Sequence, residues 1–134
     1  MRTLMLSLFL VWVVESGAGA EPKAPNGLLT AEEIAAEFPG TRMEGKSSRG
    51  EEFSECIEPG GKSVFKHPRG VSTGMMKVEE SGNACFTYQS GTWCYRVQRA
   101  PSGYIIRSID NDMVYFVRSV EREVKTCDAS DLIS

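Results

Sequence analysis

Three short segments of this sequence contain residue types that could do chemistry: residues 58–63, His67 and residues 110–112. None of the three has the full pattern of a catalytic or metal-binding motif. Residues 58–63 end in Gly-Lys-Ser like a phosphate-binding loop, but Cys56 occupies the position where that loop needs its first glycine. His67 is the only histidine, and the proline after it predicts that it ends a strand in solvent. Residues 110–112, Asp-Asn-Asp, lack the glycine and the bidentate glutamate of a calcium loop. We therefore expect a non-enzymatic protein without a cofactor or a bound metal.

Four cysteines carry the clearest chemical signal, and they point to disulfide bonds rather than to zinc. The cysteines are Cys56, Cys85, Cys94 and Cys127. A zinc site needs closely spaced cysteine or histidine ligands, but no two cysteines here are separated by only two to four residues. In an exported chain an even number of cysteines predicts disulfides, and four cysteines allow three connectivities.

The N-terminus predicts export. Arg2 is followed by an apolar run at residues 4–14 and then by Ala-Gly-Ala at residues 18–20, the small-x-small site that a signal peptidase cleaves. The apolar run is too short to span a bilayer, which takes about 20 residues. We therefore expect residues 1–20 to be a signal peptide and residues 21–134 to form one periplasmic or secreted domain, with no membrane insertion after cleavage.

The charge balance excludes two classes of partner. The chain has a net charge of −3 and no run of basic residues. Binding to nucleic-acid phosphates or to anionic membrane surfaces requires clustered lysine and arginine. We therefore expect neither a nucleic-acid partner nor an electrostatic attachment to membranes.

Period-two hydrophobicity from Thr41 onward predicts a sheet of short strands that are separated by turn residues. The candidate strands are 41–46, 52–58, 62–67, 72–80, 84–89, 92–99, 103–109 and 113–121. Short loops favour antiparallel pairing of consecutive strands. We therefore expect a mainly β fold: a small antiparallel up-and-down barrel or a sandwich of seven or eight strands.

One short N-terminal helix is predicted ahead of the strands. Thr30 and Glu33 match a capping box, and Leu29 and Ile34 occupy the two positions of a hydrophobic staple. A Pro-Gly pair at residues 39–40 ends the helix. Because a helix of two turns is unstable alone, we expect it to cover one end of the sheet.

The segment 84–99 is predicted to form a hairpin with a two-residue tip at residues 89–90. In that register Cys85 faces Cys94, close enough for a disulfide. The two remaining cysteines then pair by elimination and tie an early strand to the C-terminal tail. If Gly91 instead forms a bulge in a three-residue loop, the register slips by one residue and the pairing loses its support.

These motifs resemble those of families of short exported proteins from Gram-negative bacteria whose function is not known. The resemblance is carried by L-T-x-x-E-I at residues 29–34, by Gly45, and by C…G-x-W-C-Y-x-V at residues 85–97. It implies a lipocalin-like or similar small β-barrel and an envelope location, and it supplies no catalytic residue. This sequence departs from the simplest form of the pattern by adding Cys56 and Cys127.

Alternation within the strands places large aromatic side chains on one buried face. Those that could line the interior of a barrel are Phe86, Tyr88, Trp93, Tyr95, Tyr104 and Tyr115. An eight-stranded barrel either fills its interior with side chains or holds one small ligand. A small apolar ligand is therefore one candidate partner.

Our first expectation, however, is a non-catalytic module that binds another protein of the cell envelope. An inhibitor of an exported hydrolase is a further alternative. Small, rigid, disulfide-bonded β domains suit both roles, because preorganisation lowers the entropic cost of binding. An interaction module predicts an exposed apolar patch, whereas a ligand-binding barrel predicts stabilisation by apolar small molecules.

Three arginines are candidates for an anion site. If residues 100–103 form the next hairpin loop, Arg96 stands opposite Arg107 on the outer face, with Arg118 on a neighbouring strand. Such a cluster could bind a phosphate or a partner's carboxylate. It could equally be a solvated face, or be neutralised by a carboxylate such as Glu121.

Overall fold

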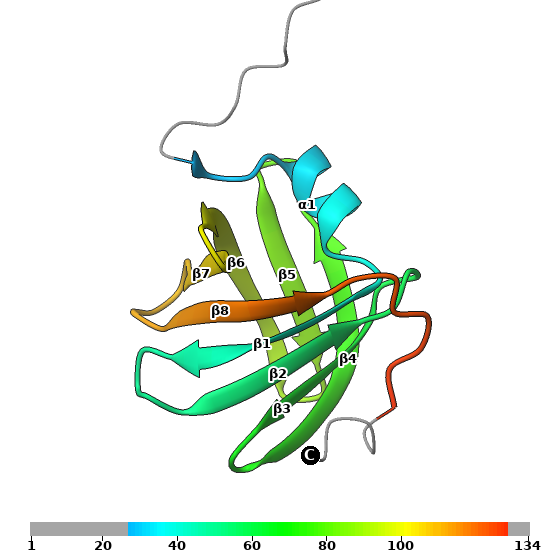
Figure 1. Cartoon of the computed structure of the whole chain (residues 1–134), viewed down its shortest axis with the longest axis vertical. Coiled ribbons are helices and arrows are strands. Elements are labelled where there is room, and N and C mark those ends of the chain that lie inside the picture. The colour runs from blue at the N-terminus through cyan, green and yellow to red at the C-terminus, as the bar shows by residue number, and fades with distance from the viewer. Residues whose placement is uncertain (1–26, 129–134) are drawn as a thin grey trace, which may run out of the picture.

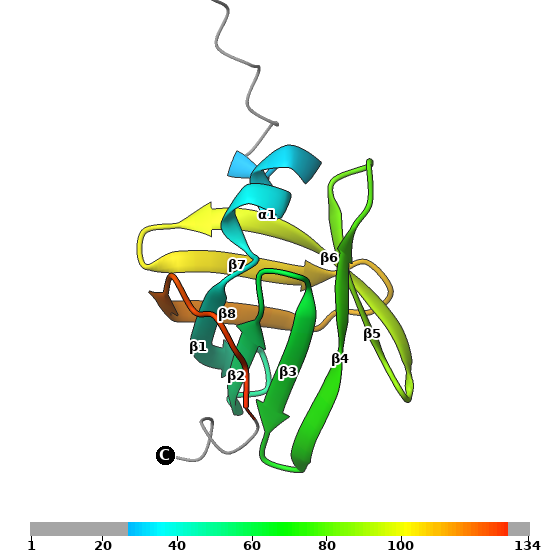
Figure 2. The same cartoon turned by 90° about the vertical axis from the view of Figure 1, so that its right-hand side faces the viewer.

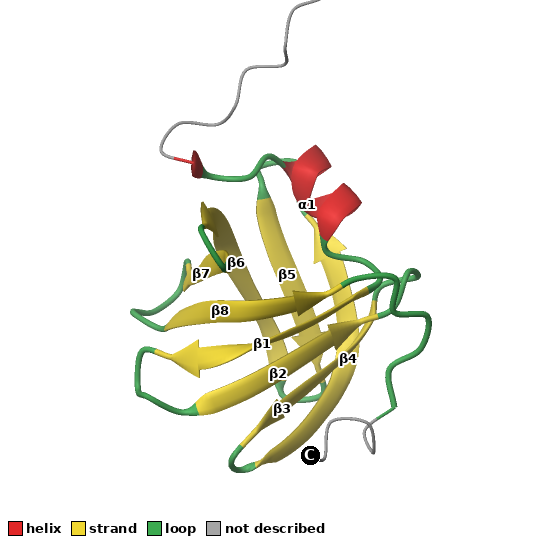
Figure 3. Ribbon diagram, viewed as in Figure 1, coloured by secondary structure: helices red, strands yellow, loops and turns green. Residues whose placement is uncertain are grey.

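Each strand hydrogen-bonds to the next strand along the chain, and the last strand closes onto the first (Figure 1). The computed structural model describes residues 27–128. Its elements are α1 (Ala31–Glu37), β1 (Thr41–Ser47), β2 (Glu52–Ile57), β3 (Lys62–His67), β4 (Gly70–Val78), β5 (Asn83–Tyr88), β6 (Gly91–Ala100), β7 (Gly103–Ser108) and β8 (Val114–Glu121). All neighbouring strands are antiparallel, so the sheet forms an up-and-down barrel (Figure 3).

The predicted fold class is confirmed, and the pairing of β8 with β1 selects the barrel over the sandwich. Each predicted strand is present with small changes at its ends; β4, for example, begins at Gly70 rather than at residue 72. The predicted signal peptide, residues 1–20, lies outside the described residues. Within residues 27–128, no helix is long and apolar enough to cross a membrane.

Helix α1 lies over one end of the barrel, as Figure 2 shows. The capping box is present: the Thr30 N–H donates to Glu33 Oε1 and the Glu33 N–H donates to Thr30 Oγ1, both at 3.2 Å. Ile34 and Phe38 are fully buried and join the core. The capping box and the hydrophobic staple define the start of the helix. Because a helix this short is stable only when its apolar face is buried, it packs against the end of the barrel.

Glycine permits two close approaches between neighbouring strands of the barrel. A Cβ on Gly45 would lie 1.9 Å from the Phe116 carbonyl oxygen, and a Cβ on Gly74 would lie 2.1 Å from the Thr87 carbonyl oxygen. The β1–β8 register shifts between Glu44 and Gly45. A side chain at either position would push the strands apart, which explains why glycine is needed there.

The two disulfides have the predicted connectivity. Cys85 faces Cys94 across β5 and β6, with 4.0 Å between their Cα atoms, so the one-residue slip at Gly91 does not occur. Cys56 on β2 is bonded to Cys127, with 5.7 Å between their Cα atoms. The second bond holds the segment after β8 against the outside of the barrel, where Cys56, Val64, Val124 and Cys127 form a small separate apolar cluster.

We expect the two disulfides to contribute unequally to stability. Cys56→Ala/Cys127→Ala should lower the free energy of unfolding by about 1.7 kcal/mol more than Cys85→Ala/Cys94→Ala, because in the chain-entropy model the longer loop restricts the unfolded chain more. The bonds join residues 71 and 9 positions apart, respectively. Urea unfolding of both double variants and the parent measures the difference, and equal losses would contradict the loop-length argument.

Candidate functional site

The interior of the barrel contains a cavity of about 360 Å³ that is open to solvent at the end away from α1. In an up-and-down barrel alternate turns share an end, so the β1–β2, β5–β6 and β7–β8 connections lie together there. Each supplies a rim residue: Arg49, Ser90, and Asn111 with Met113. The remaining lining residues are Phe53, Glu55, Phe65, His67, Ser72, Phe86, Tyr88, Trp93, Tyr95, Ile106 and Tyr115.

Five of the six aromatic residues expected to line an interior do line this cavity: Phe86, Tyr88, Trp93, Tyr95 and Tyr115. Tyr104 does not. It lies opposite Arg99 beside the β6–β7 turn, at the helix end, and its ring packs 5.1 Å from that of Phe38 between centroids. The prediction for Tyr104 was wrong because alternation fixes the face of a strand but not the end of the barrel.

Two further lining rings, Phe53 and Phe65, were missed among the candidates although their strands were predicted. Both point inward from the alternation of β2 and β3. The Tyr115 ring joins them, 5.0 Å from Phe53 and 5.9 Å from Phe65 between centroids. Tyr95 lies 5.9 Å from Tyr115 on the other side. Edge-to-face contacts of this kind hold the rings in place, so the cavity wall is preorganised.

Glu55 is the acidic residue of the cavity wall. Its side chain points inward from β2 and is buried, with 7% of the residue exposed. The Tyr88 hydroxyl donates to Glu55 Oε1 at 3.0 Å. Burial raises the pKa of the Glu55 carboxyl to about 8, and the nearby hydroxyls of Tyr88 and Ser63 offset only part of that effect. Among the described residues, no lysine or arginine forms an ion pair with Glu55.

The phenols around Glu55 stay neutral well beyond physiological pH. Burial is the largest cause that raises the pKa of Tyr88, Tyr95 and Tyr115, and the negative charge of Glu55 adds to it. Inside the cavity these hydroxyls can therefore donate and accept hydrogen bonds, but they carry no charge.

His67 lies at the cavity rim rather than free in solvent. It is half-buried at the end of β3, its ring lies 5.3 Å from that of Phe65, and its Nδ1 accepts a hydrogen bond from the Arg69 N–H at 3.2 Å. The Arg69 guanidinium forms a 2.8 Å ion pair with Glu51 beside it. The strand end was predicted correctly, whereas the solvent exposure was not.

The sequence also contains Gly-x-Ser-x-Gly at residues 70–74, the spacing of a nucleophile elbow. An elbow is a sharp strand-to-helix turn, but these residues begin the continuous strand β4. Ser72 and His67 both line the cavity, and within the described part of the chain no hydrogen bond joins them. The motif therefore lacks both the turn and the base–nucleophile contact that acyl-transfer chemistry uses.

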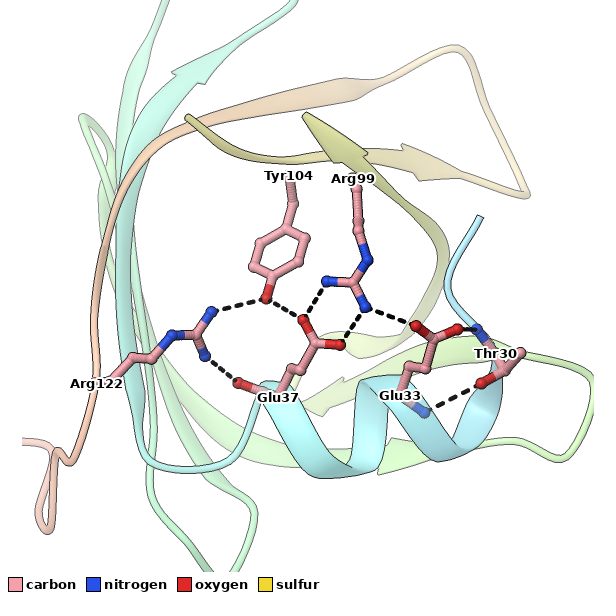
Figure 4. Close-up of polar contacts among 6 residues, drawn as sticks. All are labelled: Thr30, Glu33, Glu37, Arg99, Tyr104 and Arg122. Atoms are coloured by element: carbon pink, nitrogen blue, oxygen red, sulfur yellow. Dashed lines mark hydrogen bonds and ion pairs between the residues drawn. The ribbon is translucent and has the colours of Figure 1, made fainter. Parts of the chain in front are cut away.

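The helix end is held by a polar network that the sequence did not reveal (Figure 4). The Arg99 guanidinium contacts Glu33 once and Glu37 twice, each at 2.6 Å. The Tyr104 hydroxyl donates to Glu37 at 2.9 Å, and Arg122 donates to the Glu37 carbonyl and to the Tyr104 hydroxyl at 3.1 Å. Hydrogen bonds from Arg99 lower the pKa of both carboxyls. This network fastens α1 to β6, β7 and the segment after β8.

The predicted arginine cluster is reduced to a pair. Arg96 faces Arg107 across β6 and β7, and both line a groove on the outer wall. Arg118 lies elsewhere, 3.7 Å from Glu52, and Glu121 pairs with Arg42. Within residues 27–128, neither member of the facing pair has an acidic partner.

One group of potential metal ligands is occupied by a covalent bond. Glu79 lies against Cys85 and Cys94, with the three ligand atoms within 4.8 Å of one another. Both sulfur atoms belong to a disulfide and so present no thiolate. The prediction of no metal site therefore stands as a prediction, and this cluster gives no reason to revise it.

Comparison of the chain with known protein families, with curated proteins and with solved structures found no match. The resemblance to short exported proteins remains a prediction from the sequence motifs.

We expect Glu55 to make stability depend on pH. The unfolded carboxyl ionises near its usual pKa, whereas the folded one keeps its proton until about pH 8. Between these values the folded state binds more protons, so the free energy of unfolding should fall as pH rises, by up to about 1.4 kcal/mol per unit. Glu55→Gln should remove this slope. Urea unfolding of parent and variant from pH 5 to 8 measures it, and parallel curves would contradict the burial argument.

The facing arginines predict a second electrostatic effect. Like charges directly opposite across strands destabilise a sheet, so Arg107→Gln should raise the free energy of unfolding by a few tenths of a kcal/mol at low salt. Arg118→Gln is the control, because it removes an arginine near Glu52 and should not stabilise. Unfolding at low and high NaCl tests this, and a gain that survives high salt would point to a cause other than charge.

Proposed function

We propose that this protein is an exported binding protein that holds a small, largely apolar ligand inside its barrel. The observation that carries the proposal is the cavity of about 360 Å³ with aromatic walls. Ligand sites are typically of about 300–1,000 Å³ and combine apolar walls with a few placed polar groups. Here the polar groups include Glu55 and the hydroxyls of Tyr88 and Tyr95, and the seven phenylalanine, tyrosine and tryptophan rings supply the apolar contact.

The two ends of the barrel differ, since one is filled with side chains and the other holds the cavity, and this difference supports the same function. Ile34, Phe38 and Tyr104 fill the helix end, and the Arg99 network fastens the helix there. The other end carries the rim of turns and the cavity. A site with one filled end and contacting rings needs little reorganisation when a ligand enters, and low reorganisation favours affinity.

The interaction module and the hydrolase inhibitor have less support from the described surface. Its large exposed apolar residues are Val71 and Met75 on β4, and Ile109 and Phe116 near or on β8. β4 and β8 lie across the ring of eight strands from each other. Protein interfaces usually present one contiguous apolar patch, and separated residues on opposite walls do not make one.

The proposed location is periplasmic or extracellular. Two disulfides are consistent with an oxidising compartment outside the cytoplasm. The predicted signal peptide supports export independently. A barrel in such a compartment would meet its ligand outside the cytoplasmic membrane.

Binding can be tested with prodan, a neutral naphthalene fluorophore. The two tryptophans are Trp12 and Trp93, and Trp12 lies in the predicted signal peptide, so the cavity residue Trp93 is the only indole of the mature protein. We expect prodan emission to shift to the blue and Trp93 emission to be quenched as the probe enters. Ser72→Phe fills the cavity from the inward side of β4 and should weaken binding at least tenfold, about 1.4 kcal/mol.

Thr73→Phe is the matched control for this experiment. It adds the same ring one residue along β4, where the side chain is exposed outside the barrel. Its prodan affinity should match that of the parent. If prodan does not bind the parent, or if both phenylalanine variants bind it equally well, the cavity is not the binding site and the proposed function fails.

A further inference from the structure

The cavity holds a buried acid, Glu55, that has no basic partner in the described part of the chain, and this feature restricts the ligand. We infer that the cavity recognises an amine in its ammonium form, with Glu55 as the counter-ion and the neighbouring aromatic rings as the cage around the cation. This inference rests on the ligand-binding function proposed above and names the ligand class.

Burial of the Glu55 carboxyl costs free energy. A carboxyl group buried without a cation is destabilising unless it stays protonated, and a glutamine would keep the hydrogen bond from Tyr88 at lower cost. A buried acid without a protein cation nearby is the arrangement that a cationic ligand would complete. Glu55 lines the cavity itself, so an entering ammonium can reach it.

The rings around Glu55 suit the same ligand. Phe65 is the cross-strand neighbour of Glu55 on β3, and Tyr88 is hydrogen-bonded to it from β5. Tyr95 and Tyr115 pack edge to face with each other and also line the cavity. The negative face of an aromatic ring attracts a cation within about 6 Å, more strongly when both are desolvated. An ammonium beside Glu55 would therefore meet rings on several sides.

The other ionisable groups that face the cavity do not provide the missing cation. Tyr88, Tyr95 and Tyr115 from β5, β6 and β8 stay neutral, as described above. Arg49 comes from the β1–β2 turn and is exposed at the rim, where solvent screens its charge. His67 from β3 is also at the rim and uses Nδ1 to accept a hydrogen bond from the Arg69 N–H.

Binding of an ammonium is coupled to the release of a proton. In the free protein near pH 7 most Glu55 carboxyls are protonated, because burial raises the pKa to about 8. The ammonium keeps its own protons, the carboxyl ionises to form the ion pair, and the carboxyl proton goes to solvent. The apparent affinity should therefore rise about tenfold from pH 6 to 7 and level off above pH 8.

Three indole compounds of nearly equal size test the ligand charge: tryptamine is a cation, tryptophol is neutral and indole-3-acetate is an anion. We expect tryptamine to bind the parent at least tenfold more tightly than tryptophol at pH 8, and indole-3-acetate to bind more weakly still. Calorimetry at pH 6.5 in buffers of different ionisation enthalpy should show release of nearly one proton per tryptamine, falling toward zero at pH 9.

Glu55→Gln should lose both the preference for tryptamine and the proton release, while it keeps tryptophol binding. Glu44→Gln is the matched control, because Glu44 is exposed on the neighbouring strand β1. It should behave like the parent. The proton count is measured on the parent protein, so it tests the inference even if Glu55→Gln does not fold.

The outcomes separate this inference from the proposed function. If prodan and tryptophol bind but tryptamine gains nothing over tryptophol, or binds without proton release, the amine inference is overturned and the cavity function stands. Tighter binding of indole-3-acetate would also overturn it and would make the rim cations the recognition groups. If prodan and all three indoles fail to bind, the proposed function fails as well.

Discussion

Closure of β8 onto β1 is the constraint on which the rest of this structure depends. It removes both exposed edges of the sheet and divides every strand into an inward and an outward row of side chains. Eight strands leave an interior that side chains can just fill. Any inward residue that is short, or that turns toward the wall, therefore leaves space that nothing else in the barrel can occupy. Closure itself depends on small residues such as Gly45, where the backbone of β8 takes the place of a side chain.

The two ends of the barrel use this interior differently, and the difference arises from α1. The helix adds Ile34 and Phe38 to one end, where the Tyr104 ring meets them and the core is complete. Its acidic face is held by Arg99, so the helix is fixed by apolar burial on one side and by ion pairs on the other. Among residues 27–128, nothing covers the opposite end in this way. The inward rings there contact one another at the walls and leave the centre of the barrel to a cavity.

Much of the fold could be predicted because its signals are local. Period-two alternation located the strands, and turn chemistry set the hairpin registers in which Cys85 faces Cys94 and Arg96 faces Arg107. The capping box located α1 for the same reason. Alternation shows which side chains point inward, but it does not show toward which end of the barrel each of them lies. Tyr104 was therefore assigned to the same space as Tyr88, although they lie toward opposite ends.

Glu55 shows most clearly why the site was harder to predict than the fold. In the sequence, alternation places Glu55 on the same face of β2 as Phe53 and Ile57, but the position within one strand does not show how deeply that face is buried. Its burial follows from its inward place on β2 and from Phe65 and Tyr88, which come from two other strands. Only closure brings those strands around it. The environment that raises its pKa is therefore a property of the whole barrel, and the acid can stay inside because a neutral carboxyl hydrogen-bonded to Tyr88 is far cheaper to bury than a carboxylate. A ligand that brought a positive charge into the cavity would reverse that preference, which makes the protonation state of Glu55 a direct reporter of what the barrel holds.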